Sequence, residues 1–203
     1  DGCSNSRVEL YNSDPVTRDA RFCGTTASMC GVERAGFEGN EPMMDTAIAA
    51  DLMLHAYMFT QSGIPVLYSG DEIGQVNDYS YKEDANKAED SRYIHRGKMR
   101  WDLAERRKKK GTVEERIFNG LAELEKIRRK EKVFMSNADV WTEETCEKSV
   151  LAIGRYYDGD KMIGIYNFSE HERQVSLPNV WESCKDMRTG KEVDVKALQL
   201  SGY

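Results

Sequence analysis

The sequence predicts an α/β region followed by a small all-β domain. Residues 41–63 form one long apolar segment with helix boundary signals, and residues 64–69 form a short apolar run typical of a buried strand. A second helix with one apolar stripe is expected over residues 112–130. From about residue 138 the apolar residues alternate, which is typical of strands. A chain of 203 residues has room for one large domain or two small ones.

The N-terminal residues predict a loop and then a helix. Residues 1–40 are rich in Gly, Ser, Asn, Thr and Asp and show no sustained period, so we expect a long loop. Asn40 can cap the helix that follows, Pro42 fits its first turn, and Gly63 ends it. Eleven of the thirteen residues from Ala47 to Phe59 are apolar. A helix that is apolar on nearly every side must be covered on nearly every side.

The apolar run at residues 64–69, Ile-Pro-Val-Leu-Tyr-Ser, predicts a strand buried on both faces. Its proline lies near the start, where a strand tolerates it, and Gly70 follows its end. A strand of this kind needs parallel neighbours to close a core, and we find none elsewhere in the sequence. We therefore expect that the chain is preceded by further residues of the same protein.

A polar segment and an amphipathic helix follow the predicted strand. Residues 70–111 are dense in Asp, Asn, Lys and Tyr and predict a long loop. Thr112 and Glu115 then have the spacing of a capping box, and the helix should end near Lys130. Its apolar stripe predicts a surface helix, and the stripe consists of Val113, Ile117, Leu121, Leu124 and Ile127.

The C-terminal residues predict an antiparallel β-sandwich of roughly 65 residues. Two apolar runs, 150–153 and 162–166, flank Asp158-Gly159, and Asp-Gly between apolar runs is a strong hairpin signal. Residues 173–177 alternate, and Thr189-Gly190-Lys191 predicts another turn.

Composition excludes several classes of partner. The net charge is −6, so no global basic field exists to bind nucleic acid. The longest apolar stretch is too short to span a membrane. The cysteines are odd in number, scattered and without a C-x-x-C pair, which argues against a structural zinc site and a disulfide framework and favours a reducing, cytoplasmic location. We predict no metal and no cofactor. The cysteines are Cys3, Cys23, Cys30, Cys146 and Cys184.

Four segments resemble one enzyme family in the same order along the chain. Residues 63–74, Gly-Ile-Pro-Val-Leu-Tyr-Ser-Gly-Asp-Glu-Ile-Gly, resemble the last barrel strand of the α-amylase superfamily. Residues 77–96 are similar to the long eighth loop of amylosucrases and related sucrose hydrolases, and their Asp-Ser-Arg is the more specific signal. Residues 14–25 are similar to the amylosucrase extension after the seventh strand. Residues 164–169 resemble the C-terminal β domain of the family.

The resemblance implies the C-terminal part of a (β/α)₈ barrel enzyme. Residues 1–40 would be the loop extension after strand 7. Residues 41–135 would be the last part of the barrel, with a helix, strand 8, loop 8 and helix 8. Residues 138–203 would be the β-sandwich. The parent protein would cleave sucrose or an α-glucan with retention, which requires two carboxylates about 5 Å apart. In the family these acids precede the matched part, so no catalytic residue is assigned here.

Two alternatives remain open. The parent could be another α-glucan-active enzyme, such as an oligosaccharide glucosidase, or the chain could be a non-catalytic carbohydrate-binding or structural module. In every case the expected partner is a sugar, sucrose or an α-glucan. We expect the isolated chain to be inactive, and we expect it to self-associate because the barrel-derived helix and strand would otherwise leave apolar surface in water.

The resemblance also implies four substrate-binding residues. Arg92 falls where the family has an arginine at the bottom of the glucosyl pocket, paired with an aspartate from an earlier loop. A guanidinium suits this role because its fork can hold a carboxylate and still donate to a sugar hydroxyl. Arg21 falls where an arginine faces the acceptor sugar, although it could simply pair with Asp19. Asn12 and Asp78 are weaker assignments of the same kind.

Other polar residues have simpler interpretations. Asp71 and Glu72 are adjacent at a predicted strand end, so their side chains point to opposite sides and we expect them to shape the loop. Asp51 and His55 lie four residues apart on the apolar helix and predict a satisfied pair in a packing seam. The basic run at residues 106–110 predicts a solvated linker.

Overall fold

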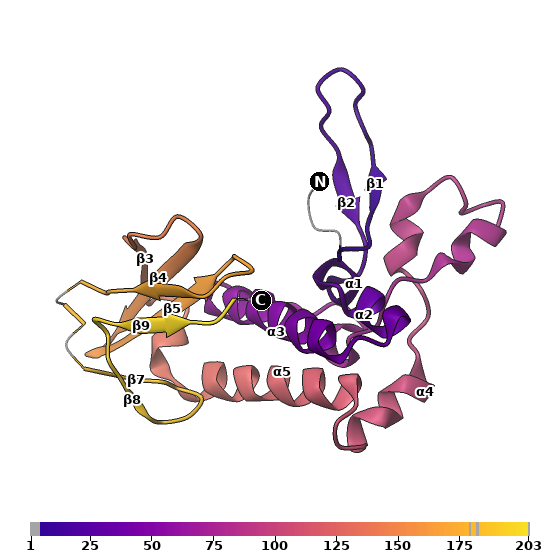
Figure 1. The fold of residues 1–203 in the computed structure, drawn as a ribbon. Helices are drawn as coiled ribbons and strands as arrows, with labels where there is room; N and C mark the ends of the chain where they lie inside the picture. The colour runs from indigo at the N-terminus through magenta and orange to yellow at the C-terminus, as the bar shows by residue number, and fades with distance from the viewer. Residues whose placement is uncertain (1–4, 179, 182, 203) are drawn as a thin grey trace. The chain divides into compact units, whose positions relative to one another are not determined.

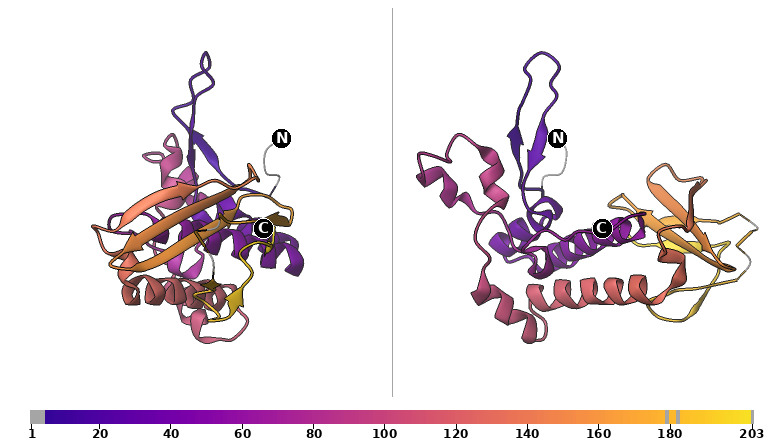
Figure 2. Two further views of the ribbon diagram at one scale, coloured as in Figure 1. Left: turned by 90° about the vertical axis from the view of Figure 1, so that its left-hand side faces the viewer. Right: turned by 180° about the vertical axis from the view of Figure 1, so that it is seen from behind.

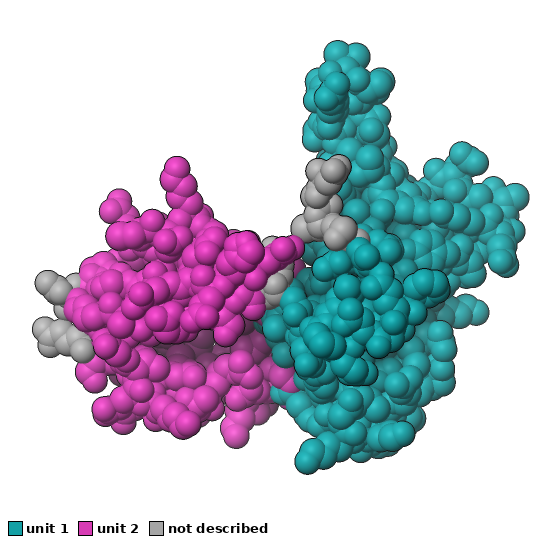
Figure 3. All heavy atoms as spheres, in the orientation of Figure 1, with its two compact units in different colours: residues 1–52, 67–119 teal, residues 53–66, 120–203 magenta. Residues whose placement is uncertain are grey.

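The computed structural model describes residues 5–178, 180–181 and 183–202. The first four residues of the predicted loop, Cys3 among them, lie outside this described part. The chain divides into two compact units (Figure 3). Unit 1 combines the chain up to Leu52 with residues Leu67–Asn119, and unit 2 combines Met53–Val66 with Gly120–Tyr203. The boundary crosses both long helices, so each unit contains part of each helix.

Unit 1 begins with a hairpin and two short helices (Figure 1). Strand β1 (Glu9–Tyr11) pairs antiparallel with β2 (Arg21–Cys23). Helix α1 (Thr26–Cys30) and helix α2 (Val32–Glu38) follow. The prediction of a continuous loop was therefore wrong for much of this segment.

The two short helices depend on their end residues, not on an apolar period. The Thr25 hydroxyl accepts a hydrogen bond from the Ser28 N–H at 3.2 Å and caps α1. Gly31 adopts φ 100° and ends α1, and Gly39 adopts φ 61° and ends α2. Helices of five and seven residues are too short to show a period in the sequence.

Helix α3 (Glu41–Thr60) confirms the predicted helix and its cap. The Met43 N–H donates to the Asn40 side-chain oxygen at 3.1 Å. The residues of α3 that are buried include Met44, Ala47, Ile48, Asp51, His55 and Phe59.

The strand predicted at residues 64–69 is absent from the structure. Residues 64–68 have no regular secondary structure, and Ile64 and Val66 are 91% and 75% exposed. A strand exists only through hydrogen bonds to a neighbouring strand, and no segment of the described chain pairs with these residues. The run is apolar, as a buried strand would be. An apolar composition alone, however, does not provide the neighbouring strand with which it would have to pair.

The predicted polar loop contains five short helical turns. Asp78 and Asp90 explain why a segment so rich in aspartate folds locally. The carboxylate of Asp78 accepts from the Ser80 N–H, and that of Asp90 accepts from the Arg92 N–H, each at 3.0 Å. The turns are η1 (Asp71–Ile73), η2 (Tyr79–Glu83), η3 (Ser91–His95), α4 (Trp101–Ala104) and η4 (Glu105–Lys108).

Helix α5 (Val113–Lys130) confirms the second predicted helix, and it ends at the expected residue. The Glu115 N–H donates to the Thr112 hydroxyl at 3.3 Å, and the Glu115 carboxylate accepts from the Gly111 N–H at 3.1 Å. Ile117 and Leu121 on the predicted stripe are 0% and 2% exposed. None of the helices described in the structure is long and apolar enough to cross a bilayer.

Unit 2 is organised around a three-stranded antiparallel sheet, whose strands lie side by side in Figure 2. Strand β4 (Val150–Tyr157) lies between β3 (Asp139–Glu143) and β5 (Asp160–Asn167). The predicted hairpin is confirmed: Tyr157 pairs with Asp160, and Asp158 and Gly159 adopt φ 48° and 87° in the two-residue turn.

Two further strand pairs complete the described part of unit 2. Strand β6 (Arg173–Val175) pairs with β9 (Leu198–Leu200), and β7 (Cys184–Lys185) pairs with β8 (Glu192–Val193) across the predicted turn at Gly190. These small sheets are antiparallel, as predicted. The buried cluster of Leu177, Trp181 and Val195 packs against residues of the three-stranded sheet, among them Trp141, Ile163 and Ile165.

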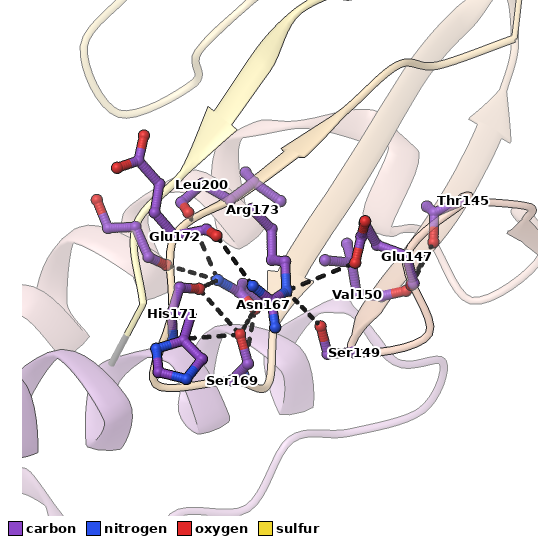
Figure 4. Close-up of polar contacts among 11 residues, drawn as sticks. Thr145, Glu147, Ser149, Val150, Asn167, Ser169, His171, Glu172, Arg173 and Leu200 are labelled. Carbon is purple, nitrogen blue, oxygen red and sulfur yellow. Dashed lines mark hydrogen bonds and ion pairs between the residues drawn. The ribbon is translucent and has the colours of Figure 1, made fainter.

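Asn167 joins the turn after β5 to the chain that follows β9 (Figure 4). Its side chain is buried, and its NH₂ donates to the carbonyls of His171 at 2.8 Å and Ser201 at 2.9 Å. Its side-chain oxygen accepts from the Ser169 N–H at 3.1 Å and hydroxyl at 2.8 Å. Asn167 and Ser169 belong to the short segment that carries the family resemblance, and their role in the structure is to close this turn.

Two arginines of unit 2 bind backbone carbonyls at helix ends. Arg155 on β4 donates to the carbonyls of Val133 at 2.7 Å and Thr60 at 2.8 Å, where Val133 belongs to η5 (Lys132–Phe134). Arg128 on α5 donates to the carbonyls of Gln61 at 3.1 Å and Gly63 at 2.6 Å. Both guanidinium groups lie over the Phe134 ring, at 5.4 and 5.5 Å from its centre.

Candidate functional site

The β1–β2 hairpin of unit 1 presents two different faces. Residues opposite one another in an antiparallel pair share a face, and the register pairs Tyr11 with Arg21 and Glu9 with Cys23. These four side chains therefore lie on one face of the hairpin. Leu10 and Phe22 lie on the other face and are 53% and 71% exposed.

The first face packs on the loop that contains η2 and η3. Cys23, Tyr81 and Ile94 form a buried apolar cluster, and Tyr11 and Tyr93 pack against it. Burial, followed by the nearby Glu9 carboxylate, raises the pKa of the Tyr81 hydroxyl, which donates a hydrogen bond to that carboxylate. The phenol therefore keeps its proton at neutral pH.

Two polar contacts reinforce this packing. The Lys82 ammonium lies 2.5 Å from the Glu9 carboxylate, and the Ser91 hydroxyl donates to the Leu10 carbonyl at 3.0 Å. Burial by itself would raise the pKa of Glu9, but the bonds from Lys82 and Tyr81 outweigh burial and lower it. Hairpin and loop thus form one connected part of unit 1, which we call the hairpin–loop module (residues 9–23 and 78–96).

Arg92 lies in this module and is held from two directions. Its Nε and Nη2 donate to the two carboxylate oxygens of Asp90 at 2.8 and 2.7 Å. Its guanidinium carbon lies 4.4 Å from the centre of the Tyr11 ring. The bond from Arg92 lowers the pKa of Asp90 to about 2, and the same bond raises the pKa of Arg92. The Arg92 side chain remains 41% exposed, so it is accessible to a ligand.

All four predicted binding residues belong to the hairpin–loop module, Arg21 and Asn12 in the hairpin and Arg92 and Asp78 in the loop. Arg21 lies across the strand pair from Tyr11, which Arg92 contacts from the loop. Asn12 directly follows Tyr11 and adopts φ 50°. The prediction placed the carboxylate partner of Arg92 in an earlier loop, whereas its partner in the described chain is Asp90, two residues away.

Asp78 has a different position, at the base of the loop. Its N–H donates to the Ile94 carbonyl at 2.8 Å, and its carboxylate caps η2. The hydrogen bonds from Ser80 lower the pKa of Asp78, with further lowering by Arg100 and Lys87. A Cβ on Gly97 would lie 2.7 Å from the Asp78 carboxylate, so a glycine is required there. These contacts give Asp78 a role in the shape of the loop.

Tyr11 and Asp90 were not singled out from the sequence. Asp90 carries a local signal, because an aspartate two residues before an arginine can both cap the turn and bind the guanidinium. Tyr11 carries no such signal. Its contact with Arg92 depends on the hairpin register and on the packing of the hairpin against a loop about 80 residues later, which cannot be read from sequence spacing.

Asp71 and Glu72 agree with their structural interpretation. The Asp71 carboxylate accepts from the Tyr68 N–H at 3.0 Å, and the Glu72 carboxylate accepts from the Gly70 N–H at 2.8 Å, so both shape the turn. Asp51 and His55 are 1% and 4% exposed. Among the residues that the structure describes, no group of three or more His, Cys, Asp or Glu side chains is arranged to hold a metal ion.

Several known enzymes are similar to this chain in sequence or in fold. No protein-family model matches the chain. The glucosylglycerate phosphorylase of Escherichia coli is 25% identical over 132 residues, which cover 64% of this chain and 23% of that enzyme. The trehalulose synthase of Pseudomonas mesoacidophila superposes with a TM-score of 0.57 over 75% of this chain and 36% of its own, at 16% identity. The chain is therefore similar in sequence to part of a glucosylglycerate phosphorylase and in fold to part of a trehalulose synthase.

Two other solved enzymes superpose in the same way. They are a maltogenic α-amylase from Thermotoga neapolitana and a trehalose-6-phosphate hydrolase variant from Bacillus licheniformis, each with a TM-score of 0.52 and 18% identity. They are covered over 34% and 37% of their lengths. The chain thus spans about a quarter to two fifths of the lengths of these proteins. At such identities the superpositions show a shared fold for the aligned part.

Proposed function

We propose that this chain is the C-terminal part of a retaining α-amylase-superfamily enzyme of the amylosucrase type, which acts on sucrose or an α-glucan. The observation that carries the proposal is Arg92, a partly exposed guanidinium held by Asp90 and Tyr11 in the loop whose Asp-Ser-Arg resembles that of amylosucrases. The relation to glucosylglycerate phosphorylase supports chemistry on a glucosyl group.

In this proposal each residue of the module has a binding role. Arg92 donates to a hydroxyl of the glucosyl ring, and Arg21 and Asn12 lie toward the acceptor sugar. Asp78 supports the loop from its base. The nucleophile and the acid/base carboxylate belong to a part of the enzyme that precedes this chain, so the 203-residue chain alone should have no activity on sucrose or α-glucans.

The domain assignment is part of the same proposal. Residues 1–40 form an extension after strand 7, residues 41–135 the end of a (β/α)₈ barrel, and residues 138–203 a β-sandwich. Residues 64–69 would become strand 8 when neighbouring strands are present to pair with them. The exposure of Ile64 and Val66 supports this, because paired strands would remove these side chains from water.

The direct test uses the complete enzyme with sucrose, maltooligosaccharides and sucrose plus inorganic phosphate as separate substrates. We expect glucosyl release or transfer from sucrose, and a severe loss of turnover in the Arg92→Ala variant with unchanged circular dichroism. Activity on maltooligosaccharides alone would select the oligosaccharide-glucosidase alternative. Activity that depends on phosphate would select a phosphorylase. No activity on any of them would select the non-catalytic module.

The isolated chain offers a second test. We propose that it self-associates through the apolar residues of the barrel-derived part, among them Ile64 and Val66. Sedimentation at micromolar concentration should show a dimer or larger species, and Val66→Lys should reduce it. A compact monomer would contradict this part of the proposal. The cytoplasmic location stays a prediction.

A further inference from the structure

We propose that Tyr11 and Asp90 are positioning residues that together fix the guanidinium of Arg92 for substrate binding. The proposal rests on the proposed function of the same site. It gives the β1–β2 hairpin an indirect role in substrate binding. The Tyr11 ring of the hairpin holds Arg92, and Arg92 binds the substrate.

The two partners of Arg92 constrain different motions. The bidentate bond to Asp90 fixes the direction of the guanidinium within its own plane, because Nε and Nη2 must both face the carboxylate. The Tyr11 ring, 4.4 Å away, limits tilting of that plane and movement away from the ring. Either partner alone would leave one of these motions free.

The contacts leave part of the guanidinium unused. An arginine carries five N–H donors, and the bonds to Asp90 use the one on Nε and one on Nη2. In the described chain no acceptor lies within hydrogen-bond distance of Nη1. With the side chain 41% exposed, these remaining donors are available to a sugar hydroxyl.

The position of Tyr11 is itself fixed by contacts of the two residues that precede it. The neighbouring Leu10 carbonyl accepts from the Ser91 hydroxyl at 3.0 Å, and Glu9 lies 2.5 Å from the Lys82 ammonium. Strand pairing places Arg21 on the same face as Tyr11. Tyr11 therefore contacts an arginine of the loop and has an arginine of the hairpin as its cross-strand neighbour, which makes it the link between the two sides of the proposed sugar site.

The first measurement tests the geometry without any substrate. In the 203-residue chain, NMR of the arginine side chains should show a slowly exchanging Nε–H for Arg92, shifted by the Tyr11 ring and identified by its loss in Arg92→Lys. Tyr11→Leu should remove the shift, Tyr11→Phe should retain it, and Asp90→Asn should accelerate exchange. An Arg92 signal that is unchanged in Tyr11→Leu would overturn the proposal.

The second measurement tests the role in the complete enzyme with sucrose. Tyr11→Leu should lower kcat/KM by about twofold to fivefold, mainly through KM, which is the range of an exposed cation–π contact. Tyr11→Phe should restore most of that loss. In an Arg92→Ala background Tyr11→Leu should have no further effect. Phe22→Leu, a matched change on the opposite face of the hairpin, should leave kcat/KM unchanged.

The outcomes separate this proposal from the proposed function. If Arg92→Ala abolishes turnover but Tyr11→Leu and Asp90→Asn leave kcat/KM unchanged, the positioning role is refuted and the proposed function stands. If Tyr11→Leu lowers kcat/KM equally with and without Arg92, the tyrosine acts on its own and the positioning role is again refuted. If Arg92→Ala retains near-wild-type turnover on sucrose, the assignment of Arg92 and the positioning role both fail.

Discussion

Arg92 in unit 1 and Arg155 in unit 2 are both held by an aromatic ring and by hydrogen bonds, yet their surroundings differ. Arg92 is 41% exposed and binds the carboxylate of Asp90. Arg155 is fully buried and donates to the carbonyls of Thr60, Val133 and Met135. No carboxylate in the described chain forms an ion pair with it. Its burial, and secondarily the nearby Arg128, lowers its pKa.

The difference separates an arginine that maintains the fold from one that is available for binding. Two acceptors of Arg155, the Thr60 carbonyl at the end of α3 and the Val133 carbonyl of η5, would otherwise be buried without this donor. All three nitrogen atoms of its guanidinium are used in this way. Arg92 keeps unused donors and an exposed edge. We therefore expect substitutions of Arg155 to affect stability and substitutions of Arg92 to affect function.

The largest expected effect is that of Arg155→Met. Removal of the guanidinium leaves the buried Thr60 and Val133 carbonyls without this donor, whereas the Met135 carbonyl still accepts from the Ala138 N–H, and each buried unsatisfied group costs about 1–3 kcal/mol. We expect the free energy of unfolding to fall by about 3–5 kcal/mol in urea denaturation. Arg128→Met is the matched control. Because Arg128 is only partly buried, this variant should lose less free energy of unfolding. Equal losses of unfolding free energy in both variants would contradict the structural role assigned to Arg155.

Substitution of glycine by alanine should change the free energy of unfolding differently in the two units. A Cβ on Gly154 of β4 would overlap the Trp141 ring, so Gly154→Ala should destabilise unit 2 by about 1–3 kcal/mol and change the near-UV circular dichroism. Gly36 lies within α2 of unit 1, where a Cβ would meet only the Met44 methyl group at 3.6 Å. Gly36→Ala should therefore be neutral or stabilising by up to about 1 kcal/mol. Destabilisation by both changes would contradict this.

A smaller effect on stability is expected for Arg92→Ala. An ion pair at the surface contributes little to stability, so the free energy of unfolding of the 203-residue chain should change only slightly. Combined with a severe loss of turnover in the complete enzyme, this would place Arg92 in binding. A loss of several kcal/mol in urea denaturation would instead make Arg92 a structural residue like Arg155.

The smallest expected effect is a pH dependence at Asp90. Its pKa is about 2 in the folded chain against an ordinary value of 3.8, so the ion pair contributes to stability above about pH 4, and the contribution is lost as pH falls through about 2. An NMR titration of the Asp90 carboxyl carbon should show a midpoint near 2, and Arg92→Ala should move it toward 3.8. A midpoint near 3.8 in the unmodified chain would show that the pair does not form.

Features with a local cause were predictable from the sequence. Asn40 caps α3 and Asp158-Gly159 turns the β4–β5 hairpin through contacts within a few residues, so the sequence alone predicted both. The run at residues 64–69 needs a paired strand and was predicted incorrectly. In the candidate site, Arg92, Arg21 and Asn12 were singled out through the family resemblance. Tyr11 was not, because its role depends on the pairing of two strands and on their packing against a distant loop.

The tryptophans of the chain provide a separate spectroscopic reporter for each unit. Trp101 in unit 1 is 74% exposed, so its fluorescence should be red-shifted and quenched by iodide. Trp141 and Trp181 in unit 2 are stacked with ring centres 6.3 Å apart, and both indole N–H groups donate to the Glu143 carboxylate. Rings at this separation couple electronically and give a split circular dichroism band that disappears when the stack opens. The split band therefore reports the opening of the Trp141–Trp181 stack in an unlabelled sample.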